Sequence, residues 1–225
     1  MENPSLTGRL AALAPPFLAG LGQEELARLL PLLHAREKAY PAQAFLFYAG
    51  QAVPGIGLML EGRVLILQED YWGRRSLIGQ AGPGELFAEA YALAQSPAGV
   101  SVQADRACRV LWLDAGALLG AGQQPCLEAL RARLLPLLAR KNLFLAGKLS
   151  CLGRRTIRQR LLSYLSQQAR QAGSPVFSIP YDRQQLADYL AVDRSALSAQ
   201  ISGLQREGVL RCRKNRFELL RPQEE

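Results

Sequence analysis

A short polar surface near the C-terminal end of the sequence carries the groups best suited to binding a partner. Arg194, Ser195 and Ser198 have forked or short hydrogen-bonding side chains, and their spacing would place them on the outward face of one helix. Such groups bond to the edges of DNA bases when a helix lies in the major groove. The spacing therefore predicts direct base contacts, provided that a helix presents these residues.

Residues 182–207 contain the signals for two short helices joined by a tight turn. Asp182, with Gln185 three residues later, forms a capping box, and Asp193 is a second N-cap. Apolar residues at i, i+4 and i+7 mark the inward face of the second helix: Leu197, Ile201 and Leu204. These signals predict a helix-turn-helix whose second helix carries the polar surface.

Residues 208–220 continue as two alternating runs around Lys214-Asn215, which predicts a β-hairpin with a basic tip. A helix-turn-helix followed by such a hairpin is a winged helix. The groups expected to contact DNA phosphates are Arg183, Ser202, Arg213, Lys214 and Arg216, with Arg154 and Arg155 as further candidates. The alternative is an ordinary small helical domain with a solvated basic face.

Charge follows the same division of the chain. The net charge is +8, and residues 150–225 hold 13 Lys/Arg against 7 Asp/Glu, a net +6. The basic excess therefore coincides with the predicted winged helix, as phosphate contact requires. No apolar run approaches the ~20 residues of a membrane span, and no signal-peptide pattern opens the sequence, so we expect a cytoplasmic protein without a membrane partner.

The sequence offers little for catalysis or metal binding. It contains no nucleophile–base pairing, no metal-ligand cluster and no useful glycine-rich phosphate loop, so no catalytic residue and no metal site are assigned and an enzyme is not expected. Its cysteines, at positions 108, 126, 151 and 212, form no CxxC and predict neither disulfides nor a zinc site. His34, the single histidine, is interpreted as a capping or surface residue, with haem or metal ligation as the alternative.

The N-terminal half mixes a short helical part with many strands. Pro15-Pro16 and several glycines predict an irregular lead-in over residues 1–22, followed by an amphipathic helix over 23–33. Short apolar or alternating runs then predict a β-sandwich or barrel, with a turn at Gly62: residues 45–48, 57–61, 64–67, 76–79, 100–102 and 109–113. Residues 87–94 break the pattern and predict one or two helical turns.

Residues 124–150 predict a long helix. Its leucines form a narrow stripe typical of a coiled-coil seam: Leu127, Leu130, Leu134, Leu138, Leu145 and Leu149. We interpret this as a two-fold dimer helix, and the alternative is a helix packed on its own barrel. Pro136 lies inside it, and a glycine hinge at Gly153 precedes a further helix over 154–171. The expected domains are a sensing barrel (1–122), a dimer helix and hinge (123–150) and the winged helix (151–225).

This order of elements resembles the cyclic-AMP receptor protein/FNR family of bacterial transcription regulators, from about Pro16 to Leu220. The strongest segments are residues 60–64, 83–89, 154–165 and 182–210. The resemblance implies an α+β fold with a cyclic-nucleotide-binding-like jelly roll, a long dimerisation helix and a winged helix-turn-helix. It also implies a homodimer on pseudo-palindromic double-stranded DNA, RNA polymerase as a further partner, and an effector bound in the barrel.

The effector that the resemblance implies does not fit this sequence. Cyclic-AMP binders of the family use a Gly-Glu pair, which falls on Ala88-Glu89, and an Arg-Ser pair for the phosphate, which falls on Gly99-Val100. The adenine-contacting position of the dimer helix falls on Asn142. Without an arginine at Gly99 the buried phosphate charge has no bidentate partner, so cyclic AMP is not expected.

Other effectors of the family also require particular residues in the sequence. An iron–sulfur cluster needs clustered N-terminal cysteines, and none precedes Cys108. Haem, a small apolar or aromatic acid, and no effector at all remain open. The base-reading positions of the family fall on Arg194, Ser195, Ser198 and Ala199, the last often arginine in the family. The predicted function is a sequence-specific transcription regulator, and the alternative is a ligand-binding module whose winged helix contacts proteins.

Overall fold

The computed structural model describes residues 5–69, 72, 75–120 and 124–220, which fold as two compact units. The first unit is Met1–Lys141 and the second is Asn142–Glu225, so their boundary lies within one helix, α5 (Pro125–Leu152). Among the described residues, no helix is both long enough and apolar enough to cross a membrane.

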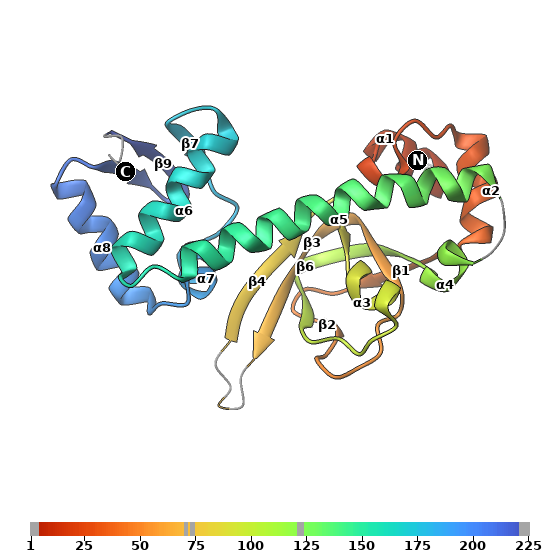
Figure 1. Cartoon of the computed structure of the whole chain (residues 1–225), viewed down its shortest axis with the longest axis horizontal. Helices are drawn as coiled ribbons and strands as arrows, with labels where there is room; N and C mark the ends of the chain where they lie inside the picture. Colours follow the sequence, from red (N-terminus) through yellow and green to blue (C-terminus); the bar gives the residue numbers. More distant parts are fainter. Residues whose placement is uncertain (1–4, 70–71, 73–74, 121–123, 221–225) are drawn as a thin grey trace. The chain divides into compact units, whose positions relative to one another are not determined.

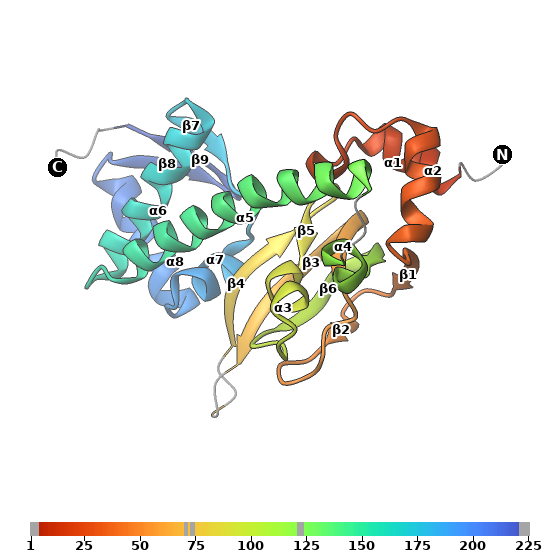
Figure 2. The same cartoon turned by 45° about the vertical axis from the view of Figure 1, so that its right-hand side comes forward.

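The first unit is built on one antiparallel sheet. Its strands are β1 (Arg36–Tyr40), β2 (Phe45–Phe47), β3 (Ile56–Glu69), β4 (Arg75–Ala81), β5 (Leu86–Phe87) and β6 (Ser101–Leu113). The main path is β1-β6-β3-β4, with β2 paired to β6 and β5 paired to β3. The long strands β3 and β6 therefore form the centre of a jelly-roll-like domain, as the α+β prediction required (Figures 1 and 2).

The predicted turn at Gly62 is wrong. Two of the predicted runs belong to the single strand β3, and two others belong to β6. Gly62 has a φ of +81°, and a Cβ there would lie 2.5 Å from the carbonyl oxygen of Ala107. The pairing of β3 with β6 shifts register on both sides of this residue, so Gly62 forms a bulge that bends a continuous strand.

The irregular lead-in predicted for residues 1–22 is also wrong over residues 5–22, and residues 1–4 lie outside the described part of the chain. Helix α1 (Leu6–Leu13) begins at the N-cap Ser5 and is followed by a 3₁₀ turn, Pro16–Leu18. Leu10 and Phe17 are fully buried with helix α2 (Gln23–Leu32) in the core of this unit. The Pro-Pro pair starts the 3₁₀ turn, because proline is tolerated at the beginning of a helix.

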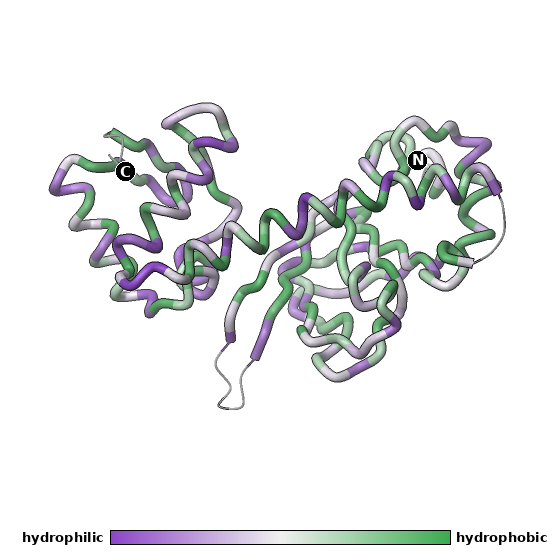
Figure 3. Tube along the Cα trace, in the orientation of Figure 1, coloured by the Kyte–Doolittle hydropathy of each residue, from purple (hydrophilic) through white to green (hydrophobic). Residues whose placement is uncertain are grey.

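The leucine stripe of α5 does not form a single exposed seam. Leu127, Leu130 and Leu134 are buried in the core of the first unit, and Leu138 packs against it, whereas Leu145 and Leu149 are exposed. This part of the helix packs on its own domain, which corrects the assignment of Leu127 and Leu134 to a dimer seam. Apolar and polar residues interleave along α5 (Figure 3). Leu135 and Leu143 are also exposed, so not all of its leucines belong to the buried face.

The second unit is a winged helix. Its elements after α5 are α6 (Ile157–Ala172), β7 (Val176–Ser178), α7 (Arg183–Leu190), α8 (Arg194–Arg206), β8 (Leu210–Arg213) and β9 (Arg216–Leu219). The strands form a sheet in the order β7-β9-β8. Helix α6 begins three residues later than predicted, because Thr156 and Gln159 make a capping box there.

The core of the second unit confirms the predicted inward face of α8. Leu197, Ile201 and Leu204 of α8 are buried, and so are Leu186 and Leu190 of α7. An aromatic cluster lies beside them, in which Tyr189 has ring contacts with Tyr164, Tyr181 and Phe144. The helix-turn-helix is therefore fixed by a packed interior.

Candidate nucleic-acid interface and effector region

Helix α8 presents a polar surface along one side. Arg194, Ser195, Ala199 and Ser202 are exposed, and Ser198 between them is half-buried. The opposite side of the helix is the buried leucine and isoleucine face. The structure thus brings the predicted base-reading residues together on one solvent-facing strip of a single helix.

The N-terminus of α8 is held by the predicted cap. The carboxylate of Asp193 accepts hydrogen bonds from the backbone N–H groups of Ser195 (2.8 Å) and Ala196 (2.9 Å), and from the hydroxyl of Ser195. These donors, the Ser195 hydroxyl foremost, hold the pKa of Asp193 below its usual value. Because the Ser195 hydroxyl donates to the capping carboxylate of Asp193, it has a structural partner before any base approaches.

Two arginines of α6 position the helix-turn-helix, and sequence reasoning missed both. Arg160 donates to the carbonyl oxygens of Leu190 (3.3 Å) and Ala191 (3.2 Å), the last carbonyls of α7. Arg158 forms an ion pair with Glu207 at the end of α8, 2.7 Å apart. A cation at a helix C-terminus satisfies orphan carbonyls and complements the dipole. The partners lie about 30 and 50 residues away, so no local spacing signals them.

The wing has the predicted basic tip. Arg213 pairs with Arg216 across the two-residue turn Lys214-Asn215, and all three cationic side chains are exposed. Lys214 has a φ of +56°, as a tight hairpin turn requires. The Asn215 side chain donates to the carbonyl of Ile179 at 3.0 Å, which ties the tip to the segment before α7. The tip is thus a fixed cationic projection.

The remaining candidates for phosphate contacts differ in the solvent exposure of their side chains. Arg154 and Arg155 are exposed in the turn between α5 and α6. Arg183 is half-buried, and its guanidinium lies 3.5 Å from the Sγ of Cys212 in the wing. Arg183 therefore braces α7 against the wing, an additional contact that the sequence did not indicate.

A buried carboxylate in the first unit lies between two helices. Glu89, the first residue of α3 (Glu89–Ala94), is 6% exposed and accepts from Lys141 of α5 at 2.8 Å. Lys141 also donates to the carbonyl of Leu86 at 2.6 Å. The second carboxylate oxygen of Glu89 is buried and makes no hydrogen bond. Sequence reasoning named Glu89 but not Lys141.

The other predicted effector residues lie on three separate segments of the chain. Ala88 precedes α3 with a φ of +60°, Gly99 is exposed and Val100 is buried. A Cβ on Gly99 would lie 3.1 Å from the Tyr91 hydroxyl. Asn142 is exposed and is the first residue of the second unit.

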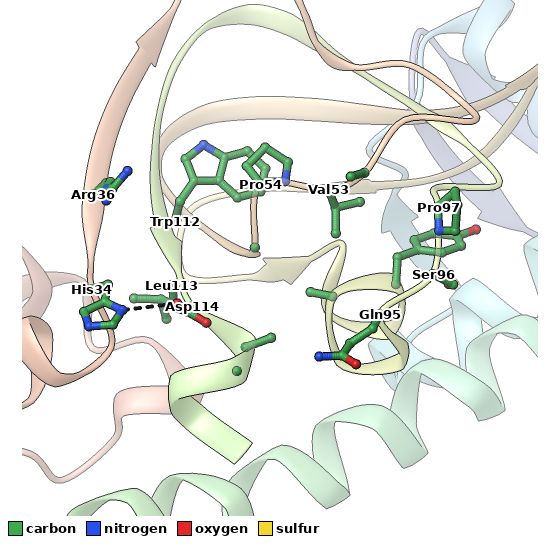
Figure 4. Close-up of a pocket in the computed structure, with 16 residues that line it drawn as sticks. His34, Arg36, Val53, Pro54, Gln95, Ser96, Pro97, Trp112, Leu113 and Asp114 are labelled. Atoms are coloured by element: carbon green, nitrogen blue, oxygen red, sulfur yellow. Dashed lines mark hydrogen bonds and ion pairs between the residues drawn. The ribbon is translucent and has the colours of Figure 1, made fainter. Parts of the chain in front are cut away.

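The first unit also contains a cavity of about 510 Å³ on another side of α3 (Figure 4). Its wall includes His34, whose Nδ1 lies 3.1 Å from the carboxylate of Asp114. His34 is 66% exposed with a φ of +44°, which agrees with its interpretation as a surface residue. Among the described residues, no group of three or more His, Cys, Asp or Glu side chains could hold a metal ion.

A jelly-roll-like domain followed by a long helix and a winged helix defines a two-part DNA-binding regulator, and comparisons with known proteins agree. The profile of the cyclic nucleotide-binding domain matches residues 37–124, and that of the Crp-like helix-turn-helix domain matches residues 159–224. The chain belongs to the Crp/Fnr family of transcription regulators, whose members are not enzymes.

Solved structures show the same fold over most of the chain. The Thermus thermophilus catabolite activator protein is 26% identical, with 91% of this chain and 93% of that one covered and a TM-score of 0.52. The c-di-GMP-responsive regulator CLP of Xanthomonas campestris is 20% identical, covering 88% and 98%, with a TM-score of 0.68. FixK2 of Bradyrhizobium japonicum is 20% identical, covering 84% and 94%, with a TM-score of 0.64. No curated protein sequence matches the chain.

Proposed function

We propose that the chain acts as a homodimer that recognises a specific pseudo-palindromic DNA site and responds to a signal other than cyclic AMP in its N-terminal domain. The observation that carries the proposal is the exposed strip of α8. Arg194 lies at the first turn of that helix, where recognition helices contact bases, and it is exposed. We further propose RNA polymerase as a protein partner, on the basis of the family.

The DNA-contact roles divide by position. Arg194, Ser195 and Ser198 lie on the strip and would contact bases, with Arg194 able to donate bidentately to a guanine. The groups proposed to contact phosphates are Ser202 farther along α8, Arg183 at the start of α7, and Arg213, Lys214 and Arg216 of the wing. Each phosphate neutralised should add about 0.9 to the slope of log affinity against log salt concentration.

A second copy of the chain is the proposed occupant of an exposed face of α5. Leu135, Leu143 and Leu149 are 70%, 73% and 71% exposed, and Ala139 and Ala146 between them are exposed as well. Their spacings of four, four, three and three residues average 3.5, the period of a coiled-coil seam, although they do not alternate as a regular heptad does. A two-fold dimer that reads successive major grooves needs its two recognition helices about 34 Å apart, one turn of DNA.

The Glu89 contact supports a signal other than cyclic AMP. The carboxylate is already engaged by the ammonium of Lys141, and no arginine lies at Gly99 to neutralise a cyclic phosphate. Displacing Lys141 would leave a buried carboxylate without its ion partner, which costs several kcal/mol as a rule.

The test is selection of bound DNA from a randomised duplex library, without added effector, using the wild-type chain, Arg194→Ala and the control Arg170→Ala. Arg170 is an exposed arginine in the last turn of α6. We expect a two-fold symmetric motif, weakened by about 1–3 kcal/mol in Arg194→Ala only. An unchanged motif and affinity in Arg194→Ala would refute the assignment of the strip. Absence of any DNA binding at low salt would favour a winged helix that contacts proteins.

The dimer is tested separately by sedimentation of Leu143→Glu and Leu135→Glu. The control is Leu119→Glu, at a leucine of α4 (Ala115–Leu119) that is 52% exposed. We expect both α5 variants to sediment as monomers and the control to remain a dimer. A wild-type chain that is monomeric at micromolar concentration would contradict the proposed seam.

A further inference from the structure

The Ser195 hydroxyl, in the first turn of α8, has a partner that determines how it can bond to DNA. Together with the backbone N–H groups of Ser195 and Ala196, the hydroxyl donates to a single carboxylate oxygen, Oδ1 of Asp193. Ser195 and Asp193 are both exposed. The hydroxyl is therefore held by the cap of its own helix, while its oxygen remains open to a partner from outside.

The proton of this side-chain bond belongs to the hydroxyl and not to the carboxyl group. The Ser195 hydroxyl, followed by backbone N–H groups of the same turn, holds the pKa of Asp193 below its usual value, so the carboxylate is ionised at neutral pH. An ionised carboxylate only accepts, whereas a serine hydroxyl has one proton and two lone pairs. Because the single proton points to Asp193, only the lone pairs of Ser195 are available to a base.

An acceptor of this kind can distinguish the two orientations of a base pair. In the major groove each pair presents one amino group, N6 of adenine or N4 of cytosine, and one carbonyl oxygen, O4 of thymine or O6 of guanine, on the opposite strand. The lone pairs of Ser195 can accept from the amino group. A carbonyl oxygen at the same point would face the serine oxygen with no proton between them, and a desolvated acceptor without a donor is unfavourable.

We propose that Ser195 reads an exocyclic amino group and so selects adenine or cytosine at one position of the contacted strand, with Asp193 as the residue that positions its hydroxyl. The inference deepens the proposed function and rests on it, because it requires α8 to lie in the major groove. Asp193 acts through Ser195 and need not touch the DNA.

Arg194, the neighbouring residue of the strip, has the opposite hydrogen-bonding polarity. Its guanidinium carries only donors, which suit the O6 and N7 acceptors of guanine. The first turn of α8 thus presents a side chain that only donates beside one that only accepts. Each half-site is expected to contain a guanine for Arg194 and, at a separate position, an amino-bearing base for Ser195.

The position that Ser195 reads is found by selection from a randomised duplex library, as the position at which the motifs of the wild-type chain and Ser195→Ala differ. The wild-type chain and its variants are then titrated with the four duplexes that differ only there. A fifth duplex carries the analogue without the amino group, purine in place of adenine or 2-pyrimidinone in place of cytosine. Each base pair has one amino group in the major groove, so this analogue removes the proposed donor.

Three further variants separate the role of the hydroxyl from that of the helix cap. Asp193→Gly removes the partner of the hydroxyl but leaves a residue that helices accept as an N-cap, whereas Asp193→Asn keeps an oxygen acceptor. The matched control is Ser178→Ala, at an exposed serine of β7. Because each preference is a ratio measured with one variant, a change in the folded fraction of that variant cancels.

We expect the wild-type chain to bind the two pairs with the amino group on one strand at least about fivefold more tightly than the two reversed pairs, and to lose as much with the analogue. Ser195→Ala should bind all five duplexes within about twofold of one another. Asp193→Gly should lose the preference, because a free hydroxyl can also donate to a carbonyl oxygen. Asp193→Asn and Ser178→Ala should keep it.

Several results would overturn the inference and leave the proposed function standing. They are a motif that Ser195→Ala does not change, a preference that groups adenine with guanine or with thymine, and wild-type affinity that is insensitive to loss of the amino group. A preference that persists in Asp193→Gly, or that is lost in Asp193→Asn, would also overturn it. Absence of any motif with the wild-type chain would refute the proposed function, and the inference with it.

Discussion

Replacing Lys141 by methionine should destabilise the first unit far more than a surface substitution does. Glu89 is 7% exposed at its side chain, and Lys141 is its one ion-pair partner among the described residues. The variant leaves a buried carboxylate and the Leu86 carbonyl without their donor. Breaking a buried pair costs about 3–5 kcal/mol. Since Lys141 is 41% exposed, solvent screens the pair and we expect about 2 kcal/mol.

The assay is urea unfolding followed by tryptophan fluorescence, because Trp72 and Trp112 both belong to the first unit. The control is Arg140→Met, at the exposed residue that precedes Lys141 in α5. The double variant with Glu89→Gln should recover about 1 kcal/mol relative to the sum of the two single changes, since the neutral amide leaves no buried charge. A Lys141→Met variant no less stable than Arg140→Met would refute the reasoning.

Three further predictions concern other contacts. Arg160→Met should cost the helix-turn-helix about 1.5–3 kcal/mol in thermal unfolding through the lost bonds to the end of α7, while the exposed Arg170→Met should cost little. Gly62→Ala should destabilise the first unit by about 2 kcal/mol or more, and Gly79→Ala, where a Cβ meets nothing within 4 Å, should not. Burial lowers the pKa of Lys148 to about 8, so between pH 8 and 10 this group binds more protons in the unfolded chain than in the folded one, and the stability of the wild-type chain relative to Lys148→Met should rise over that range.

The second unit could be predicted closely because its signals are local. Asp182 with Gln185, and Asp193 before α8, are capping patterns complete within four residues, and the structure confirms them. The turn at Lys214-Asn215 is likewise set by the residues that form it. The contact of Arg160 with the end of α7 could not be predicted, because its partners are the backbone carbonyls of Leu190 and Ala191. Every residue has a backbone carbonyl, so the sequence does not indicate which ones an arginine binds.

The first unit was predicted less well because its decisive contacts are long-range. A glycine between two apolar runs looks the same whether it turns the chain or forms a bulge, and only the pairing of β3 with β6 makes Gly62 the latter. The ion pair of Glu89 and Lys141 joins residues 52 positions apart, so Glu89 was visible as a family position while its partner was not. The cavity depends on four separate segments and gave no sequence signal.

Helix α5 shows why spacing alone could not settle the dimer face. Leu127, Leu130 and Leu134 are spaced as a seam would be, but they face the core of their own unit. A period of 3.5 or 3.6 residues marks an apolar face without saying what covers it. The exposed fraction of the side chains distinguishes the buried face of α5 from the proposed dimer face, since Leu143 is 73% exposed. Leu143 lies two residues after Lys141. A change at the Glu89–Lys141 contact therefore acts within one turn of the proposed dimer seam, so a signal at α3 needs no long path to reach it.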